Sequence, residues 1–309
     1  AKVDHIKDDD TFGGVFGVTK GLAKKYSRKR VIDTPIAEHI TLSTAVGAAA
    51  TGLRPIAELM FNDFIGFGLD PILNQGAKMR YMFGGKAKIP LVVRTVHGAG
   101  ASAAAQHSQS LYNMFAAIPG VKVVVPSNPY DAKGLLMSAI QENNLVVFSE
   151  DKTLLGQKGN VPEEPYTIEI GKANVTREGD DLTIVAIGKM VAVAEETAEK
   201  LAEDQVSVEV IDLRSVSPWD QETVLDSVKK TGRLIVIDES NPQCNIAGDV
   251  ASVIGDVGFD YLDGPIKKVT APDTPVPFAA NLEAAYMPNA DKVLDIASEL
   301  IDDLKKANA

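Results

Sequence analysis

The sequence predicts an α/β protein made of two doubly wound domains. Short apolar runs alternate along the chain with segments of helical periodicity, which is typical of mostly parallel sheets with helices on both faces. The alternation stops between about 151 and 180, where Gly, Pro and charged residues gather, and it then resumes. At 309 residues the chain is long for one core, so two domains of roughly 150 residues each are expected.

The strands are predicted from apolar runs with little polar alternation, as expected for strands covered on both faces. These runs span 30–33, 55–61, 89–96, 121–127, 145–150, 181–188, 206–212 and 233–240. A mostly parallel sheet in each half of the chain accounts for them.

Helices are predicted between these runs. Asn128 is a good N-cap, with Pro129 at the first helical position and Asp131 in the first turn, so a helix is expected from there to about Asn143. Apolar stripes at helical spacing mark three more helices. Their members are Leu69, Ile72, Leu73 and Gly76; Val191, Ala194, Ala198 and Leu201; and Val293, Ile296, Ala297, Leu300, Ile301 and Leu304.

Composition narrows the class of partners. With 31 Lys and Arg against 42 Asp and Glu, a net charge of −11 argues against a nucleic-acid surface. No apolar run reaches the length of a membrane span, and the first residues lack a secretory segment, so a cytoplasmic protein is expected. The single cysteine, Cys244, excludes an intrachain disulfide and is expected to be a small buried filler.

Phosphate-binding signatures are missing from the sequence. There is no Walker sequence and no GxGxxG between a strand and a helix. There is also no Gly-Asp-Gly segment with a downstream Asn. The glycine pairs Gly13–Gly14 and Gly84–Gly85 are expected to form turns.

Three long segments carry a family resemblance. They are VIDTPIAEHITLSTAVGAAATGLRPIAELMFNDF at 31–64, AAAQHSQSLYNMFAAIPGVKVVVPSNPYDAKGLLMSAIQENN at 103–144, and the run from DLTIVAIGKM at 181 to the last helix. Together they resemble the beta subunits of thiamine-diphosphate-dependent 2-oxo acid and acetoin dehydrogenase components, which are transketolase-like proteins. RYMFGGKAKIP and ELMFNDFIGFGLD are most similar to the acetoin-type branch.

The resemblance implies a domain plan and an assembly. Residues 1–155 are expected to form a pyrimidine-binding transketolase-like domain, 156–180 an interdomain linker, and 181–309 a transketolase C-terminal-like domain. Thiamine diphosphate is then shared with an alpha subunit, which holds the diphosphate and magnesium, in a heterotetramer. Thiamine-diphosphate enzymes hold the metal and the diphosphate with a Gly-Asp-Gly segment and a downstream Asn, so the absence of that segment fits such a beta chain. The family's first helix and strand are not recognisable, and we expect them to lie before or around residue 1.

The resemblance also assigns three site residues. Glu38 matches the glutamate of the DTPIxE motif. The carboxyl group of that glutamate forms a hydrogen bond with the pyrimidine ring nitrogen of the cofactor and favours the cofactor's imino tautomer. Phe64 matches an aromatic that packs on the pyrimidine ring. His107, in AAQHSQS, matches a histidine at the cleft mouth that handles a proton or assists acyl transfer. From residue type alone, the favoured interpretations are a solvent-facing glutamate, a core phenylalanine, and a helix-cap or core histidine.

A monovalent cation is a further expectation from the resemblance. Leu91, Ala139, Glu142 and Asn144 match positions where some relatives bind potassium, largely through backbone carbonyls. Hard cations prefer oxygen ligands, but every residue carries a carbonyl, so an empty turn remains the alternative.

Other residues at strand ends are weaker candidates for the functional site. His97 begins a glycine-rich turn, HGAGAS, that can face the cleft and tune substrate choice. Arg214, Glu239 and Asn241 follow strands and are expected to serve subunit contact or structure.

The implied activity is cleavage of acetoin and transfer of the resulting acetyl unit to the lipoyl group of an acyltransferase partner, by this chain together with its alpha subunit. The alternative within the class is a beta subunit of pyruvate or branched-chain 2-oxo acid dehydrogenase. An alternative of another class is a noncatalytic dinucleotide-binding or structural subunit.

Overall fold

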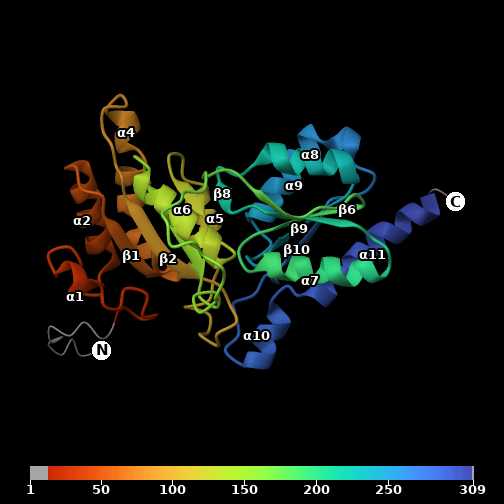
Figure 1. Ribbon diagram of the computed structural model, residues 1–309, viewed down its shortest axis with the longest axis horizontal. Helices are drawn as coiled ribbons and strands as arrows, with labels where there is room; N and C mark the ends of the chain where they lie inside the picture. Colours follow the sequence, from red (N-terminus) through yellow and green to blue (C-terminus); the bar gives the residue numbers. More distant parts are fainter. Residues whose placement is uncertain (1–12, 308–309) are drawn as a thin grey trace.

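The chain folds into two α/β domains, each built around a five-stranded sheet, as the computed structural model of residues 13–307 shows (Figure 1). The two α/β domains lie side by side, with the N-terminal half on the left of the view and the C-terminal helix extending from the right. The predicted fold class is therefore confirmed. Within the described residues, no helix has the length and apolar character needed to cross a membrane.

The first sheet has the order β1-β2-β4-β3-β8. Four strands run parallel: β1 (Ile56–Phe61), β2 (Val92–His97), β4 (Val146–Asp151) and β3 (Lys122–Val124). The edge strand β8 (Ser215–Ser217) comes from the second half of the chain and pairs antiparallel with β3. A strand from beyond the linker thus completes the first sheet.

Helices cover both faces of this sheet. α6 begins at the predicted N-cap, since the Asn128 side chain accepts a hydrogen bond from the Asp131 amide at 2.9 Å, and it ends at Gln141. α6 packs on one face, while α2, α5 and the turns around α3 pack on the other. The helices of this half are α1 (Leu22–Tyr26), α2 (Glu38–Ala50), η1 (Asn62–Phe64), α3 (Ile65–Asp70), η2 (Pro71–Gly76), α4 (Met79–Met82), α5 (Tyr112–Ala116) and α6 (Pro129–Gln141).

Two sequence expectations for this domain need correction. The run at 30–33 is not a strand: it pairs with no strand among the described residues, and Ile32 is 72% exposed. The helix expected from Leu69 is interrupted: η2 is a π-helical turn that begins at Pro71, a residue without the N–H that an α-helical bond requires.

The second sheet has the order β10-β9-β6-β7-β5. The parallel strands are β10 (Lys267–Thr270), β9 (Leu234–Asp238), β6 (Leu182–Ala186) and β7 (Val208–Asp212). The antiparallel edge strand β5 (Asn174–Arg177) lies inside the stretch expected to be the linker, so the second sheet begins before residue 181.

Helices also enclose the second sheet, with α8 and α9 above it and α7 and α11 below it in Figure 1. The apolar stripe predicted for the last helix is buried at Val293, Ala297 and Leu300. Cys244, expected to be buried, is exposed in a loop. The helices are α7 (Met190–Glu203), α8 (Gln221–Thr231), α9 (Ile246–Val257), η3 (Phe259–Tyr261), α10 (Ala280–Tyr286) and α11 (Ala290–Ala307).

A buried polar network joins the domains beside β7. Arg214 donates to both oxygens of Asp131 on α6, at 3.0 and 2.7 Å. Asp212, the last residue of β7, accepts from the Ser127 hydroxyl at 2.5 Å and from the Arg214 amide at 2.8 Å. Burial raises the pKa of Asp212 from its ordinary 3.8 to about 7, and the hydrogen bonds from Ser127 and Arg214 only partly oppose that rise.

This shift predicts a pH-dependent stability that Asp212→Asn removes. Because the folded chain holds the Asp212 proton more tightly than the unfolded chain, the free energy of unfolding falls as the pH rises from about 4 to about 7. The asparagine variant is neutral throughout, so its stability relative to wild type should rise across that window, by up to about 1.4 kcal/mol per pH unit. Urea unfolding of both proteins across the window checks this. Parallel stability curves contradict it.

Candidate active site

Glu38 is the first residue of α2 and is half-buried. Opposite it lies Gly68 of α3, where an added Cβ would meet Leu42 at 2.3 Å and the Glu38 Cβ at 4.0 Å. Glycine therefore lets α3 approach the N-terminal turn of α2 closely. Among the described residues, none forms a hydrogen bond or ion pair with the Glu38 carboxylate, which leaves the group available to a ligand.

Phe64 and His107 come together in a small cluster of rings. The His107 ring meets Phe61 edge-on with centroids 4.8 Å apart and Phe64 edge-on at 5.3 Å. Phe16 adds a further edge contact to Phe61 at 5.6 Å. Both Phe64 and His107 are half-buried, so each ring keeps one accessible part. Since α3 starts directly after Phe64 and packs on α2, the structure brings Phe64, His107 and the Glu38 turn into one neighbourhood.

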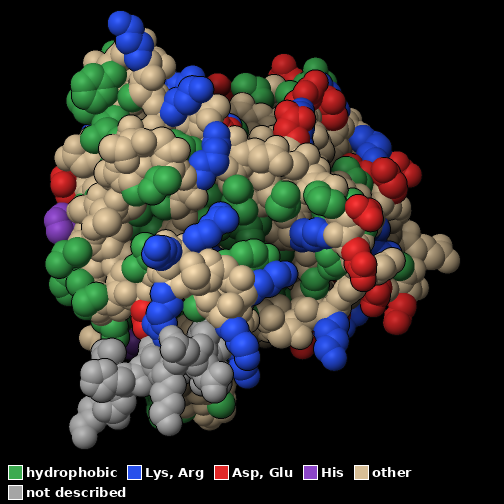
Figure 2. All heavy atoms as spheres, turned by 60° about the vertical axis from the view of Figure 1, so that its left-hand side comes forward, with side chains coloured by type: hydrophobic (Ala, Val, Ile, Leu, Met, Phe, Trp, Pro, Cys, Tyr) green, Lys and Arg blue, Asp and Glu red, His purple; other side chains and the backbone are tan. Residues whose placement is uncertain are grey.

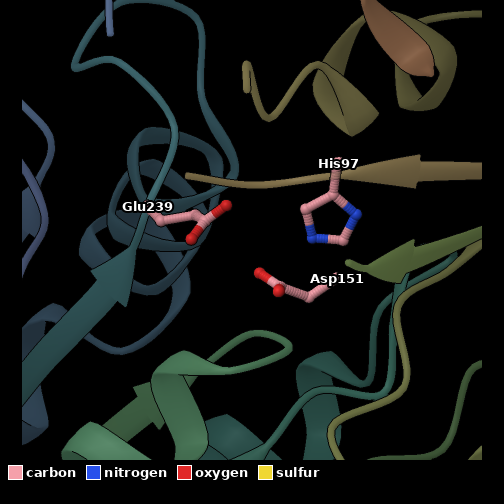
Figure 3. A group of neighbouring side chains, drawn as sticks. All are labelled: His97, Asp151 and Glu239. Atoms are coloured by element: carbon pink, nitrogen blue, oxygen red, sulfur yellow. The ribbon is translucent and has the colours of Figure 1, made fainter. Parts of the chain in front are cut away.

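A group of buried polar side chains lies at the carboxyl ends of the strands, between the domains (Figure 3). His97 ends β2 and Asp151 ends β4, while Glu239 directly follows β9 of the second domain. The Lys189 ammonium lies between the two carboxylates, 3.2 Å from Asp151 and 2.5 Å from Glu239. The His97 Nδ1 is 2.8 Å from the Ser149 hydroxyl. All of these side chains except Lys189 are fully or almost fully buried.

Burial controls the protonation of this junction. It lowers the pKa of His97 to about 4 despite the nearby Asp151, so the imidazole is neutral at pH 7. Burial also raises the pKa of Glu239, to about 7, although Lys189 opposes the rise. For Lys189 burial acts to lower the pKa, but Glu239 and Asp151 outweigh it and raise the value. The junction thus stabilises the charged form of Lys189.

The junction has the spacing of a metal site but the wrong charge. Ligand atoms of His97, Asp151 and Glu239 all lie within 4.8 Å of one another. Lys189 already places a positive charge between the carboxylates, and a divalent ion there would face electrostatic repulsion. We therefore interpret the cluster as an interdomain ion-pair junction. His97, expected to face the cleft, is instead buried in this junction, with 2% of its surface exposed.

The four residues matched to a potassium site gather at the end of α6. The carbonyls of Leu91 and Ala139 accept backbone hydrogen bonds within the fold. The Arg54 guanidinium donates to the Glu142 carbonyl at 2.9 Å. The Arg80 guanidinium donates to the Asn144 side-chain oxygen at 3.1 Å. A monovalent cation at this turn would share its ligands with these groups.

Comparison with known proteins places both domains in one family. The model of the transketolase pyrimidine binding domain matches residues 6–158, and that of the transketolase C-terminal domain matches residues 171–293. A solved structure described as a split gene transketolase, inactive beta4 tetramer, has a TM-score of 0.75 at 23% identity. The match covers 97% of this chain and 90% of the solved chain, which shows a shared fold.

Relatives of known activity cover nearly the whole chain. The acetoin:2,6-dichlorophenolindophenol oxidoreductase subunit beta of Bacillus subtilis is 58% identical over 97% of this chain and 88% of its own. The protein of the same description from Cupriavidus necator is 52% identical over 93% and 84%. The pyruvate dehydrogenase E1 component subunit beta of B. subtilis is 44% identical over 94% and 89%. The chain therefore belongs to the transketolase-like family of thiamine-diphosphate-dependent oxidoreductase beta subunits.

Proposed function

We propose that this chain is the beta subunit of an enzyme that cleaves acetoin and passes the acetyl unit to a lipoyl group, acting only together with an alpha subunit. The observation that carries the proposal is the Phe64–His107 ring contact, in which Phe64 is followed along the chain by a helix that packs on α2, which begins at Glu38, in a chain 58% identical to an acetoin oxidoreductase beta subunit. The lower identity to a pyruvate dehydrogenase beta subunit, 44%, favours acetoin over a 2-oxo acid.

Glu38 is proposed to bind the pyrimidine of thiamine diphosphate. Bound thiamine diphosphate supplies a thiazolium that stabilises negative charge on the reacting carbon. The Glu38 carboxyl group holds a proton against the pyrimidine ring nitrogen, which favours the tautomer that the cofactor needs. Its half-buried place at the start of α2 suits this task, because partial loss of water strengthens a hydrogen bond of this kind.

Phe64 and His107 are proposed to complete this end of the site. The accessible part of the Phe64 ring packs against the pyrimidine and fixes its plane by offset contact. No described residue hydrogen-bonds the His107 ring, which is held only by edge contacts with Phe61 and Phe64. Its nitrogens are therefore free to give a proton to, or take one from, the reacting oxygen or the lipoyl arm.

The first domain exposes the surface that an alpha subunit would cover. Several large apolar side chains there are more than half exposed, and Figure 2 shows hydrophobic side chains spread over this side of the molecule. They include Ile32, Ile36, Ile40, Phe67, Tyr81, Met82 and Phe83. Exposed apolar surface on this scale is typical of a protein interface. Three of these residues, Ile32, Ile36 and Ile40, flank Glu38 along the chain, so a partner there would close the cofactor site.

The remaining cofactor and partner assignments follow from the same proposal. Magnesium is assigned to the alpha subunit, because this chain lacks the Gly-Asp-Gly segment. Potassium is assigned to the turn formed by Leu91, Ala139, Glu142 and Asn144. The acetyl acceptor is the lipoyl group of a dihydrolipoamide acyltransferase, and the assembly is a cytoplasmic heterotetramer.

Dye-coupled oxidation by the assembled complex tests the proposed substrate. We expect acetoin to support dye reduction with added thiamine diphosphate and magnesium, and pyruvate and a branched-chain 2-oxo acid to support far less. Preference for a 2-oxo acid would keep Glu38 and the cofactor but overturn the substrate. A complex that is folded but inactive with all three would overturn the proposed function.

A further inference from the structure

The loop that carries His107 is apolar and packed at its ends, where Ala99 and Leu111 join apolar clusters. This loop, residues 98–111, runs from β2 to α5 between the two domains. A hollow of about 240 Å³ opens behind it, lined by Ala105 and Gln109 of the loop and by second-domain residues that include Asn241 and Tyr286. Between these apolar ends, the loop borders the hollow and is held by polar anchors.

Lys152 is the anchor closest to His107. It directly follows β4, is 8% exposed, and donates a hydrogen bond to the His107 carbonyl oxygen. Its ammonium also donates to the Ser108 hydroxyl at 3.2 Å. One side chain on a rigid strand end therefore holds the backbone of the residue that carries the imidazole.

Asp63 anchors the loop from the opposite side. Its Oδ1 accepts from the Gln109 amide at 3.1 Å and from the Gln109 side chain at 2.9 Å. Asp63 immediately precedes Phe64, whose ring meets His107 edge-on. These two hydrogen bonds therefore link the His107 loop to the residue before Phe64.

The second domain holds the remainder of the loop. Glu283 of α10 accepts from the amides of Gly100 and Ser102, each at 2.8 Å. Ser102 and Ala104 have φ values of 49° and 60°, in the left-handed region that non-glycine residues adopt only when surrounding contacts impose it. The loop is thus held under local strain by its polar anchors.

The charges around Lys152 explain why this anchor is a lysine. Burial lowers the pKa of Lys152, while Asp63, Asp151 and Glu283 act to raise it. These carboxylates belong to both domains and favour a positive charge at Lys152. The cation donates to the His107 carbonyl oxygen and to the Ser108 hydroxyl.

We propose that Lys152 and Asp63 are positioning residues that orient the His107 ring against Phe64 for the proton transfer. The inference rests on the proposed function, because it requires that His107 acts in the reaction. A misplacement of about 1 Å at a reacting group can reduce a rate about a hundredfold, so loss of either anchor acts on kcat rather than on substrate binding.

A double-mutant cycle in the assembled complex tests this. We expect Lys152→Met to lower kcat by about tenfold to a hundredfold with little change in KM. In a His107→Ala background the same change should have almost no further effect, since the group that it positions is gone. Lys152→Arg, which keeps donors near the loop carbonyl, should restore part of the activity. Lys158→Met, at an exposed lysine six residues further along, is the matched control.

A second variant covers the case in which Lys152→Met prevents folding. Gln109→Met removes the side-chain bond to Asp63 and leaves the backbone bond and all charges in place. It should lower kcat in the wild-type background and not in the His107→Ala background.

The outcomes separate the two hypotheses. Full activity in His107→Ala overturns the role proposed for His107 and this inference with it. If His107→Ala lowers kcat and the loss of kcat from Lys152→Met, or from Gln109→Met, adds fully to it, only the positioning role is overturned. An unchanged kcat in both anchor variants also overturns it.

Discussion

Replacing Glu38 with glutamine is expected to lower acetoin-dependent turnover of the assembled complex by about 10²–10⁴-fold, the range for loss of a positioned proton-transfer group. Glutamine preserves the shape of the half-buried side chain at the start of α2 but cannot supply an acidic proton. Steady-state dye reduction at saturating thiamine diphosphate measures the effect.

The control for this prediction is Glu163→Gln, which makes the same chemical change at an exposed position. It should leave turnover unchanged. Binding of thiamine diphosphate by both variants, followed calorimetrically, shows whether the lost activity reflects chemistry rather than an empty site. A Glu38→Gln complex with wild-type turnover would remove Glu38 from the mechanism.

Replacing Lys189 with methionine is expected to destabilise the chain by about 3–5 kcal/mol, the cost of leaving buried charges without their partner. Methionine fills a similar volume, so the loss comes from charge. Asp151 and Glu239 would face each other across the domain junction without the ammonium that now lies 3.2 and 2.5 Å from them. The midpoint of urea unfolding reports the change.

Two further variants identify charge as the cause. Lys200 makes comparable ion pairs with Glu196 and Asp291, but these are on the surface, so Lys200→Met should have little effect. Adding Asp151→Asn and Glu239→Gln to Lys189→Met removes the unpaired carboxylates and should recover most of the lost stability. Equal destabilisation at Lys189 and Lys200 would refute the account of the junction.

The strands and main helices could be predicted because their signals are local. Buried parallel strands require apolar residues on both faces, and the runs at 89–96, 145–150 and 181–188 all form central strands. Asn128 and Pro129 mark the start of α6 by their own chemistry. The run at 30–33 has the same apolar character, yet it is not a strand, because pairing depends on a neighbour that sequence alone does not supply.

The site was only partly predictable for a similar reason. Family motifs name Glu38, Phe64 and His107. In the structure Phe64 contacts His107, and α3, which follows Phe64, packs on the helix that begins at Glu38. Lys152 and Lys189 were missed, because their roles depend on groups distant in sequence. A signal was present: Asp151 and Asp212 end buried strands, and Glu239 directly follows one. Carboxyl ends of parallel strands meet at one edge of a sheet.

The central claim is that this chain supplies one half of an acetoin-cleaving site. A titration of this chain into a fixed amount of its purified alpha subunit, with acetoin, thiamine diphosphate and magnesium, tests it most directly. We expect no dye reduction by either chain alone, a linear rise on mixing, and a break at equal amounts of the two chains. Acetoin-dependent activity of this chain alone, or none at any ratio in a formed complex, would contradict the account.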